Sequence, residues 1–154
     1  MKRTLIVLLA LVMVLCCACS NTSQKPLTEV YNDIKAQVTF EDVNELTDIS
    51  QMERYYGITD EMAAEYAGCI NASGVEQEEV VLVKAVDDAA ATQIKEKLDT
   101  RYQSKLNQNK NYNAEQAAMI EKCSVDQDGL YVSMIISDNA DTIKKIYRED
   151  LGLS

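Results

Sequence analysis

The chain has 154 residues, 47% of them hydrophobic, with 25 acidic and 15 basic side chains and a formal net charge of −10. It contains no histidine, which excludes Ser-His-Asp triads and Cys-His nucleophilic pairs and removes the commonest zinc ligand. The excess of acid also makes nucleic acid a poor partner, because its phosphate backbone repels an acidic surface.

The first residues have the pattern of a bacterial signal peptide. Lys2 and Arg3 precede an uninterrupted apolar run over 5–15. This run has the length of a signal-peptide core and is too short for a permanent membrane span. We therefore predict a signal peptide over 1–18.

The segment that follows the apolar run resembles a lipobox, the site of lipid attachment in bacterial lipoproteins. Residues 16–21 read Cys-Cys-Ala-Cys-Ser-Asn, and the small Ala18 favours cleavage before Cys19, although Cys16 stands where leucine is usual. We predict lipidation of Cys19, with palmitate-type acyl chains that hold the protein on the extracytoplasmic face of the cell membrane. The alternative is an ordinary secreted protein cut near Ala18.

Cleavage at this point divides the chain into three parts. Loss of 1–18, which carries two basic residues and no acid, would leave 136 residues with a formal charge of −12. The polar segment 19–26 reads as the lipidated cysteine and a flexible tether. Residues 27–154 have the length of one domain.

Three helical segments are expected at the start of this domain. The segment 27–38 has apolar residues at spacings of three and four, which predicts a helix with one apolar face. A short helix over 48–56 is expected to stop at Gly57. One or two further helical turns are expected over 59–65, with Thr59 as the cap. The residues of the first apolar face are Leu27, Val30, Tyr31, Ile34 and Val38.

The pattern then changes to that of strands. Residues 66–73 and 79–86 are predicted to be paired strands, with a turn over 74–78. A long helix should begin at Asp87, followed by an amide-rich loop over 107–112 and a short helix over 113–122 with a capping box. The apolar stripe of the long helix is Ala90, Ile94, Leu98, Tyr102 and Leu106.

The last part of the chain repeats the scheme. A strand from 122 leads into a hairpin turn over 126–129, a second strand over 130–137 and a final helix. Two strand-strand-helix units predict an α+β fold with a four-stranded antiparallel sheet and helices mainly on one face. The α+β assignment does not depend on whether the two units are a true duplication.

Two short motifs carry a family resemblance. Tyr55-Tyr56-Gly57-Ile58 and Glu65-Tyr66-Ala67-Gly68 follow the lipoprotein-type start and precede an apolar strand and an Asp-rich helix start. In these features the chain resembles the lipoproteins of Gram-positive, clostridial-type anaerobes grouped as domain of unknown function 4358. The resemblance runs from about residue 27 to near the C-terminus. It implies an envelope location and a small α+β domain, and it assigns no catalytic residue.

Cys69 and Cys123 are the cysteines that remain after the lipidated one. Outside the cytoplasm two cysteines can form a disulfide, and the two repeated units would place both in corresponding strands. The alternative is a pair of buried free thiols. No metal site is expected, because no second type of ligand lies nearby in the sequence.

Two acidic turns are candidate cation sites with simpler explanations. Asp126-x-Asp128-Gly129 begins like a calcium loop but lacks the third carboxylate, and Asp-Gly between strands favours a tight hairpin. Glu76, Glu78 and Glu79 cluster at the other turn, where a solvated acidic loop is the preferred reading.

Tyrosine is the one enriched aromatic residue, with eight copies against a single phenylalanine. Tyr55, Tyr56 and Tyr66 lie close together in sequence and are the candidate binding surface, since tyrosine combines an apolar ring with a polar hydroxyl. The competing interpretation is that these rings pack helix against sheet.

The sequence favours a non-enzymatic binding or scaffolding module with no cofactor and with an envelope protein as candidate partner. The alternative function is a carboxylate-dependent cell-wall hydrolase, which needs two carboxyl groups roughly 5–10 Å apart in a cleft. Capture of solutes for a transporter fits poorly, because such receptors are normally two-lobed proteins that close on their ligand.

Overall fold

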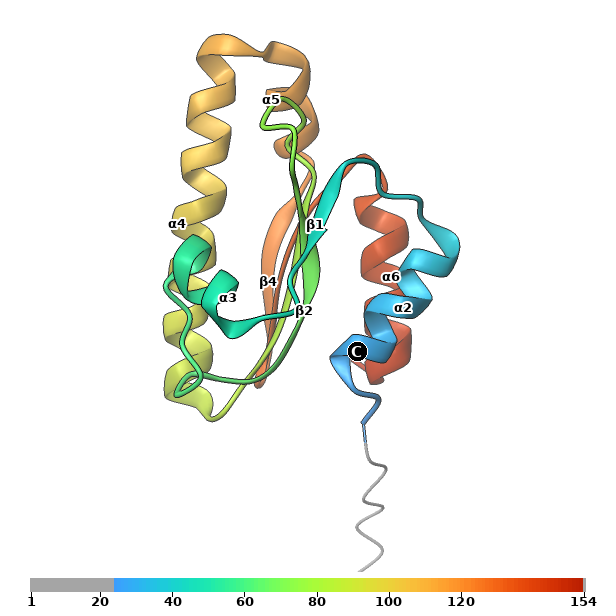
Figure 1. Ribbon diagram of the computed structural model, residues 1–154, viewed down its shortest axis with the longest axis vertical. Coiled ribbons are helices and arrows are strands. Elements are labelled where there is room, and N and C mark those ends of the chain that lie inside the picture. Colours follow the sequence, from blue (N-terminus) through green and yellow to red (C-terminus); the bar gives the residue numbers. More distant parts are fainter. Residues whose placement is uncertain (1–23, 154) are drawn as a thin grey trace, which may run out of the picture.

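The computed structural model describes residues 24–153, which form one α+β domain around an antiparallel sheet (Figure 1). The sheet has five strands in the order β1-β2-β3-β5-β4. The expected four-stranded sheet is therefore one strand short. The strands are β1 (Val43–Glu45), β2 (Ala63–Asn71), β3 (Glu79–Ala85), β4 (Ser124–Asp128) and β5 (Tyr131–Ile136).

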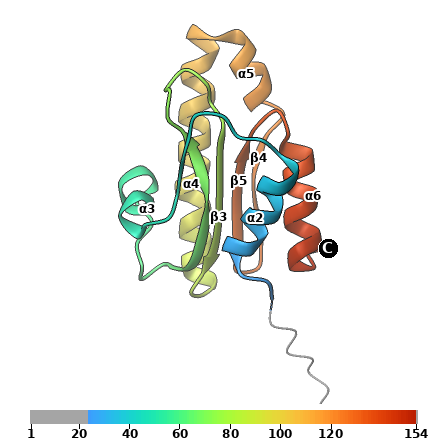
Figure 2. The same ribbon diagram turned by 45° about the vertical axis from the view of Figure 1, so that its right-hand side comes forward.

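Helices cover both faces of the sheet, and the prediction of helices mainly on one face is wrong. One face is covered by α4, with α3 and α5 beside it, and the other by α2 and α6 (Figures 1 and 2). The helices are α2 (Leu27–Gln37), α3 (Ile49–Tyr56), α4 (Asp88–Tyr112), α5 (Ala114–Ile120) and α6 (Ala140–Leu151).

The two strand-strand-helix units occur in the expected chain order, as β2-β3-α4 and β4-β5-α6. Their inner strands, β3 and β5, pair antiparallel at the centre of the sheet. A twofold axis that exchanges two antiparallel strands is perpendicular to the sheet and keeps both helices on one face. Because α4 and α6 lie on opposite faces, the two units are not related by such an axis (Figure 2).

The first two helices form as the sequence predicts. The whole predicted apolar face of α2 is buried. In α3 the side chain of Asp48 accepts a hydrogen bond from Ser50 N, and Gln51 completes a capping box. Gly57 ends this helix with a positive φ of 68°, a left-handed conformation that glycine adopts easily.

The helical segment expected over 59–65 is wrong beyond its first turn. Met62 N donates to Thr59 O, but β2 already begins at Ala63, which pairs with Ala85 of β3. Pairing with the buried central strand overrides the local helical preference of Met-Ala-Ala-Glu.

The amide-rich segment 107–112 is not a loop, because α4 continues through it to Tyr112. Asn109 is buried, and its side chain donates to the carbonyl of Lys105 one turn earlier. Packing of this last part of α4 against α5 keeps residues of weak helical preference in the helix.

The second hairpin is tighter than expected. β4 extends to Asp128, which pairs with Tyr131, so the turn consists of Gly129 and Leu130. Asp126 Oδ2 lies 3.1 Å from Lys144 Nζ, and Asp128 Oδ2 lies 2.8 Å from Arg148 Nη1. The two carboxylates therefore join the hairpin to α6, which agrees with the hairpin reading rather than with a calcium loop.

The predicted signal peptide over 1–18, Cys19 and most of the tether over 19–26 lie outside the described residues. Within 24–153, no helix is both long and apolar enough to cross a membrane.

Candidate functional site

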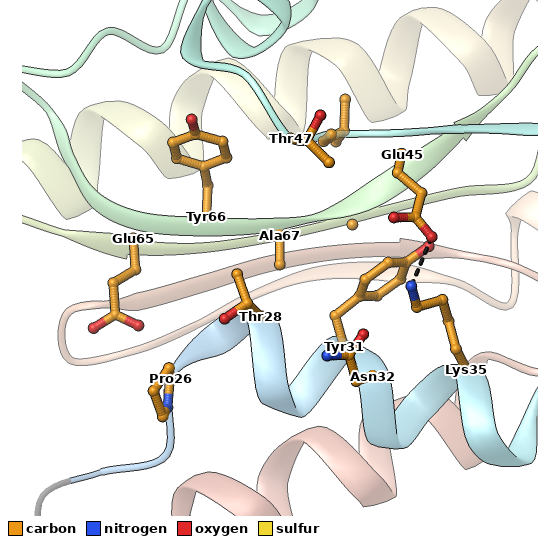
Figure 3. Close-up of a pocket in the computed structure, with 12 residues that line it drawn as sticks. Pro26, Thr28, Tyr31, Asn32, Lys35, Glu45, Thr47, Glu65, Tyr66 and Ala67 are labelled. Carbon is orange, nitrogen blue, oxygen red and sulfur yellow. Dashed lines mark hydrogen bonds and ion pairs between the residues drawn. The ribbon is translucent and has the colours of Figure 1, made fainter.

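A groove lies between α2 and the edge of β2 and is called here the α2–β2 groove. Its volume is about 510 Å³. Residues of α2 form one wall and residues of β2, with the side chains of Glu65 and Ala67 directed toward α2, form the other (Figure 3). The residues that matter for its chemistry are Pro26, Thr28, Tyr31, Thr47, Glu65 and Tyr66.

The groove exists because β1 covers only part of the edge of β2. Leu46 N donates to Gly68 O at 2.9 Å, and the same register would next pair Asp48 with Tyr66. Asp48 instead caps α3, and its N–H donates to Oε1 of Gln51 at 3.0 Å. The demands of the α3 cap therefore stop the pairing of β1 two residues short of Tyr66.

Tyr66 presents an unpaired backbone at this edge. Neighbouring residues of a strand point their N–H and C=O groups to opposite sides, so Tyr66 faces the same side as Gly68 and away from β3. Within the described part of the chain, no backbone group or side chain bonds to the outward N–H or C=O of Tyr66. This stretch of β2 is thus an uncovered sheet edge that can pair with another strand.

Glu65 holds the two walls of the groove together. Its Oε2 accepts a hydrogen bond from Leu27 N at 3.0 Å, and its Oε1 lies 3.1 Å from Lys84 Nζ. Pro26 at the start of α2 provides no side-chain cap. The carboxylate of Glu65 takes that role, where the helix dipole favours negative charge.

The other end of the groove is closed by charge and by an aromatic ring. Lys35 Nζ lies 2.6 Å from Glu45 Oε1 and 4.9 Å from the centre of the Tyr31 ring. Burial raises the pKa of Tyr31, and its hydroxyl has no hydrogen-bond partner among the described residues. The groove therefore combines apolar surface with a few polar groups at its ends, as ligand-binding clefts do.

The three predicted tyrosines do not form one surface. The rings of Tyr55 and Tyr56 lie 6.2 Å apart on α3 and line a smaller hollow against α4, called here the α3–α4 pocket. Tyr66 lines the α2–β2 groove, and its ring points to the opposite side of β2 from α2 (Figure 3). Tyr56 is buried and packs in the core, as the competing interpretation expected.

Glu79, predicted to lie in a solvated acidic turn, is fully buried at the start of β3. Its Oε2 lies 2.7 Å from Lys105 Nζ and 3.0 Å from Arg101 Nη2, and Arg101 Nε donates to Oε1. Burial lowers the pKa of Lys105 against the opposing pull of Glu79. Three charges thus neutralise one another in part beneath the tyrosine pair.

A third hollow of about 280 Å³, called here the acidic pocket, is lined by four carboxylates from three segments. The Ser137 hydroxyl donates to Glu78 Oε1 at 2.6 Å. Burial raises the pKa of Glu78, and the charge of Asp138 adds to this increase. Carboxyl groups whose environments push their pKa values apart can divide acid and base roles between them. Among residues 24–153 no three side chains are grouped so as to hold a metal ion. The carboxylates of this pocket are Glu41, Glu76, Glu78 and Asp138.

Cys69 and Cys123 are both buried free thiols. The paired rows of the sheet run from Cys69 through Val80 and Ile135 to Ser124, the neighbour of Cys123. Three strand spacings put the first and last of these about 14 Å apart, twice the Cα separation that a disulfide allows. The disulfide is therefore absent, and the free-thiol alternative is the one that the structure shows.

Sequence reasoning missed the α2–β2 groove because the strand that leaves the edge open has three residues and no clear strand pattern. It also missed the cations of the α3–α4 pocket, although a signal was present. Lys97, Arg101 and Lys105 recur every fourth residue and so share one face of α4.

The fold and the groove define a small α+β domain with a five-stranded antiparallel sheet, helices on both faces and an uncovered stretch of β2 at Tyr66. The chain belongs to the family described as Domain of unknown function (DUF4358), whose model matches residues 36–137. Comparison with curated proteins and with solved structures gives no match. The match confirms the resemblance to this family, and the two tyrosine motifs lie within the matched residues.

Proposed function

We propose that this protein is a lipid-anchored, extracytoplasmic binding module, without enzymatic activity, that captures an extended segment of an envelope protein in the α2–β2 groove. The observation that carries the proposal is the uncovered edge of β2 at Tyr66, directly beside the groove. The lipoprotein-type N-terminus and the resemblance to Gram-positive lipoproteins support the location.

The chemistry of the edge selects an extended polypeptide. A strand laid along the outward side of β2 would continue the line of β1 and bond to the N–H and C=O of Tyr66. Such strand addition obtains affinity from the backbone and specificity from alternate side chains of the peptide. The wall of α2, with Thr28 and Tyr31, offers the surface on which those side chains would pack.

The predicted tether limits where the partner can be. Pro26 lines the groove and lies seven residues after the lipidated Cys19. A fully extended chain of this length spans at most about 25 Å. The groove of the anchored protein would therefore face segments close to the membrane, such as the membrane-proximal part of another envelope protein.

A proline substitution tests the edge itself. Peptides would first be selected from a random display library on the full chain held in non-ionic detergent. Tyr66→Pro removes the outward N–H without removing a β2–β3 hydrogen bond, since proline is tolerated on edge strands. We expect this variant to bind the selected peptides about tenfold more weakly. That is the affinity lost when the hydrogen bond from Tyr66 N–H to the peptide is removed and the adjacent backbone bonds to the peptide are disturbed.

Tyr66→Ala is the matched control, because it removes the ring, which points away from α2, and keeps the N–H. It should bind within about twofold of the wild type, a difference below about 0.5 kcal/mol. Equal binding by the proline variant, or equal losses in both variants, would contradict strand addition.

The lipid anchor is tested separately in cells. The full precursor and its Cys19→Ala variant would be compared by membrane fractionation, and by crosslinking and affinity purification through a C-terminal tag. We expect the wild type in the membrane fraction together with one envelope protein, and the variant released from the membrane without it. Identical fractionation of the two proteins would contradict lipidation at Cys19.

The acidic pocket keeps a second candidate function open, that of a carboxylate-dependent cell-wall hydrolase. The supporting observation is the raised pKa of Glu78 beside Glu76, Glu41 and Asp138. If this function holds, purified full-length protein should release fragments from cell-wall material, and Glu78→Gln should abolish that release. Absence of release by the wild type would leave the binding module as the account of the domain.

A further inference from the structure

The α3–α4 pocket concentrates positive charge in a protein that is otherwise acidic. Its volume is about 340 Å³. It lies across the sheet from the α2–β2 groove, because α4 and α2 cover opposite faces (Figure 2). Its walls come from the C-terminal end of α3 and the middle of α4, with Tyr55, Tyr56, Lys97, Thr100, Arg101 and Ser104.

Among residues 24–153, Lys97 is the cation of α4 that lacks a counterion. The other four cations of this helix, Lys95, Arg101, Lys105 and Lys110, each form an ion pair. Lys97 is half-buried and has no carboxylate within ion-pair distance in the part of the chain described. Its Nζ lies beside Gly57, 3.3 Å from where a β-carbon would be, and so at the rim of the pocket.

The buried ion cluster below the pocket adds to this positive charge. Arg101 and Lys105 share the single carboxylate of Glu79. Together with Lys97, three cations therefore face one anion, a surplus of two positive charges. Arg101 bonds to Glu79 through Nε and Nη2, which leaves Nη1 for another acceptor.

The neutral groups of the pocket are hydrogen-bond donors as well. The hydroxyls of Ser104 on α4 and Tyr55 on α3 are such donors, whereas the Thr100 hydroxyl already donates to Glu96 O at 2.8 Å. Tyr56 also lines the pocket, but it is 6% exposed and its hydroxyl interacts with the carboxylate of Glu79 in the buried ion cluster. A site with surplus donors and surplus positive charge fits a ligand that is only an acceptor.

We propose that the α3–α4 pocket binds a phosphate group, either as the free ion or as a phosphate ester on a larger envelope molecule. A phosphate monoester carries nearly two negative charges near neutral pH, which matches the surplus of two. Its oxygens accept hydrogen bonds in several directions and can use Lys97, Arg101 and the hydroxyls together. A carboxylate has half the charge and fewer acceptor oxygens, and so fits the site less well.

The test is a calorimetric titration of the full chain in non-ionic detergent and phosphate-free buffer, at constant ionic strength. The probes are inorganic phosphate, glycerol phosphate and acetate. We expect saturable, one-to-one binding of phosphate with Kd on the order of 1 mM, and at least tenfold weaker binding of acetate. Tighter binding of glycerol phosphate than of inorganic phosphate would show that the natural group is an ester; equal binding would identify the free ion as sufficient.

Variants at Lys97 distinguish a specific phosphate site from nonspecific electrostatic attraction of the anion. Lys97→Gln should weaken phosphate binding about tenfold, the loss expected for one charge-assisted hydrogen bond, and Lys97→Arg should restore most of it. Lys145→Gln, which removes a charge that is 73% exposed on α6, is the control and should leave Kd unchanged. The proposal is overturned by unsaturable binding, by acetate binding as tightly as phosphate, or by equal losses in Lys97→Gln and Lys145→Gln.

Discussion

The carboxylate of Glu79 lies 2.7 Å from the ammonium of Lys105, with the first side chain fully buried and the second nearly so. A buried carboxylate that loses its charge leaves its cationic partners buried without compensation. We therefore expect Glu79→Gln to lower the free energy of unfolding by about 3 kcal/mol in urea titrations followed by circular dichroism. Glu149→Gln, which breaks a mostly exposed pair with Lys145, should cost less than about 0.5 kcal/mol. Equal decreases in the free energy of unfolding in the two variants would show that burial does not determine how much Glu79 contributes to stability.

Gly68 is the tightest backbone position of the sheet. A β-carbon on this residue would lie 1.9 Å from the carbonyl oxygen of Val80, and its φ of 145° disfavours other residues. Gly68→Ala should lower the free energy of unfolding by at least about 3 kcal/mol, because backbone atoms of β3 must move. Gly74→Ala, at a turn with nothing within 4 Å of the added atom, should cost about 1 kcal/mol. A Gly68→Ala protein as stable as the Gly74→Ala protein would contradict the contact with β3.

The two free thiols should be unreactive in the folded protein. Burial raises the pKa of the Cys69 thiol to about 11, and burial also raises the pKa of Cys123. Because the thiolate is the reacting form, neither residue should react with a disulfide reagent at pH 8 within minutes, while both should react at once in urea. The assay is best made on the Cys19→Ala precursor, with each thiol located by peptide mass analysis. Rapid modification of Cys69 in the folded protein would show that β2 is less well packed than described.

The sequence contained the information for the elements with strong local signals. The apolar spacing of α2, the Asp48 cap and the Asp87 start of α4 each act within one turn, so that pattern and structure agree. Features decided by distant contacts were not predictable in this way. Ala63 joins β2 because Ala85 lies opposite, and Glu79 is buried because Arg101 and Lys105 reach it from α4.

The candidate sites follow the same division. The regular spacing of the cations along α4 is apparent in the sequence. The buried ion cluster could not be predicted from it, because the cluster depends on where the fold places Glu79. The α2–β2 groove depends on where β1 stops pairing, which the side chain of Gln51 decides by accepting from Asp48 N. No local pattern in residues 43–48 predicts where the pairing of β1 with β2 ends.

Glu78 should make stability depend on pH. Burial, and to a smaller extent the charge of Asp138, raise its pKa, so that the folded protein disfavours its ionised form more than the unfolded chain does. At pH 7 this lowers stability, and Glu78→Gln, which still accepts from Ser137, should be the more stable protein. As the pH falls through the raised pKa toward the ordinary value of 4.5, protonated Glu78 resembles glutamine and the difference should shrink. Urea titrations at several pH values between 7 and 4 measure this difference; a constant difference would contradict the assignment.

The most direct test of the central claim, capture of a polypeptide segment in the α2–β2 groove, is site-specific photocrosslinking in intact cells. A benzophenone side chain would replace Thr28, an exposed residue of the groove, or Thr92, an exposed residue of α4 on the other side of the sheet. The account predicts a crosslinked envelope protein from position 28 only, and its loss when Tyr66→Pro is added. The same products from both positions, or no loss with Tyr66→Pro, would contradict binding at the edge of β2.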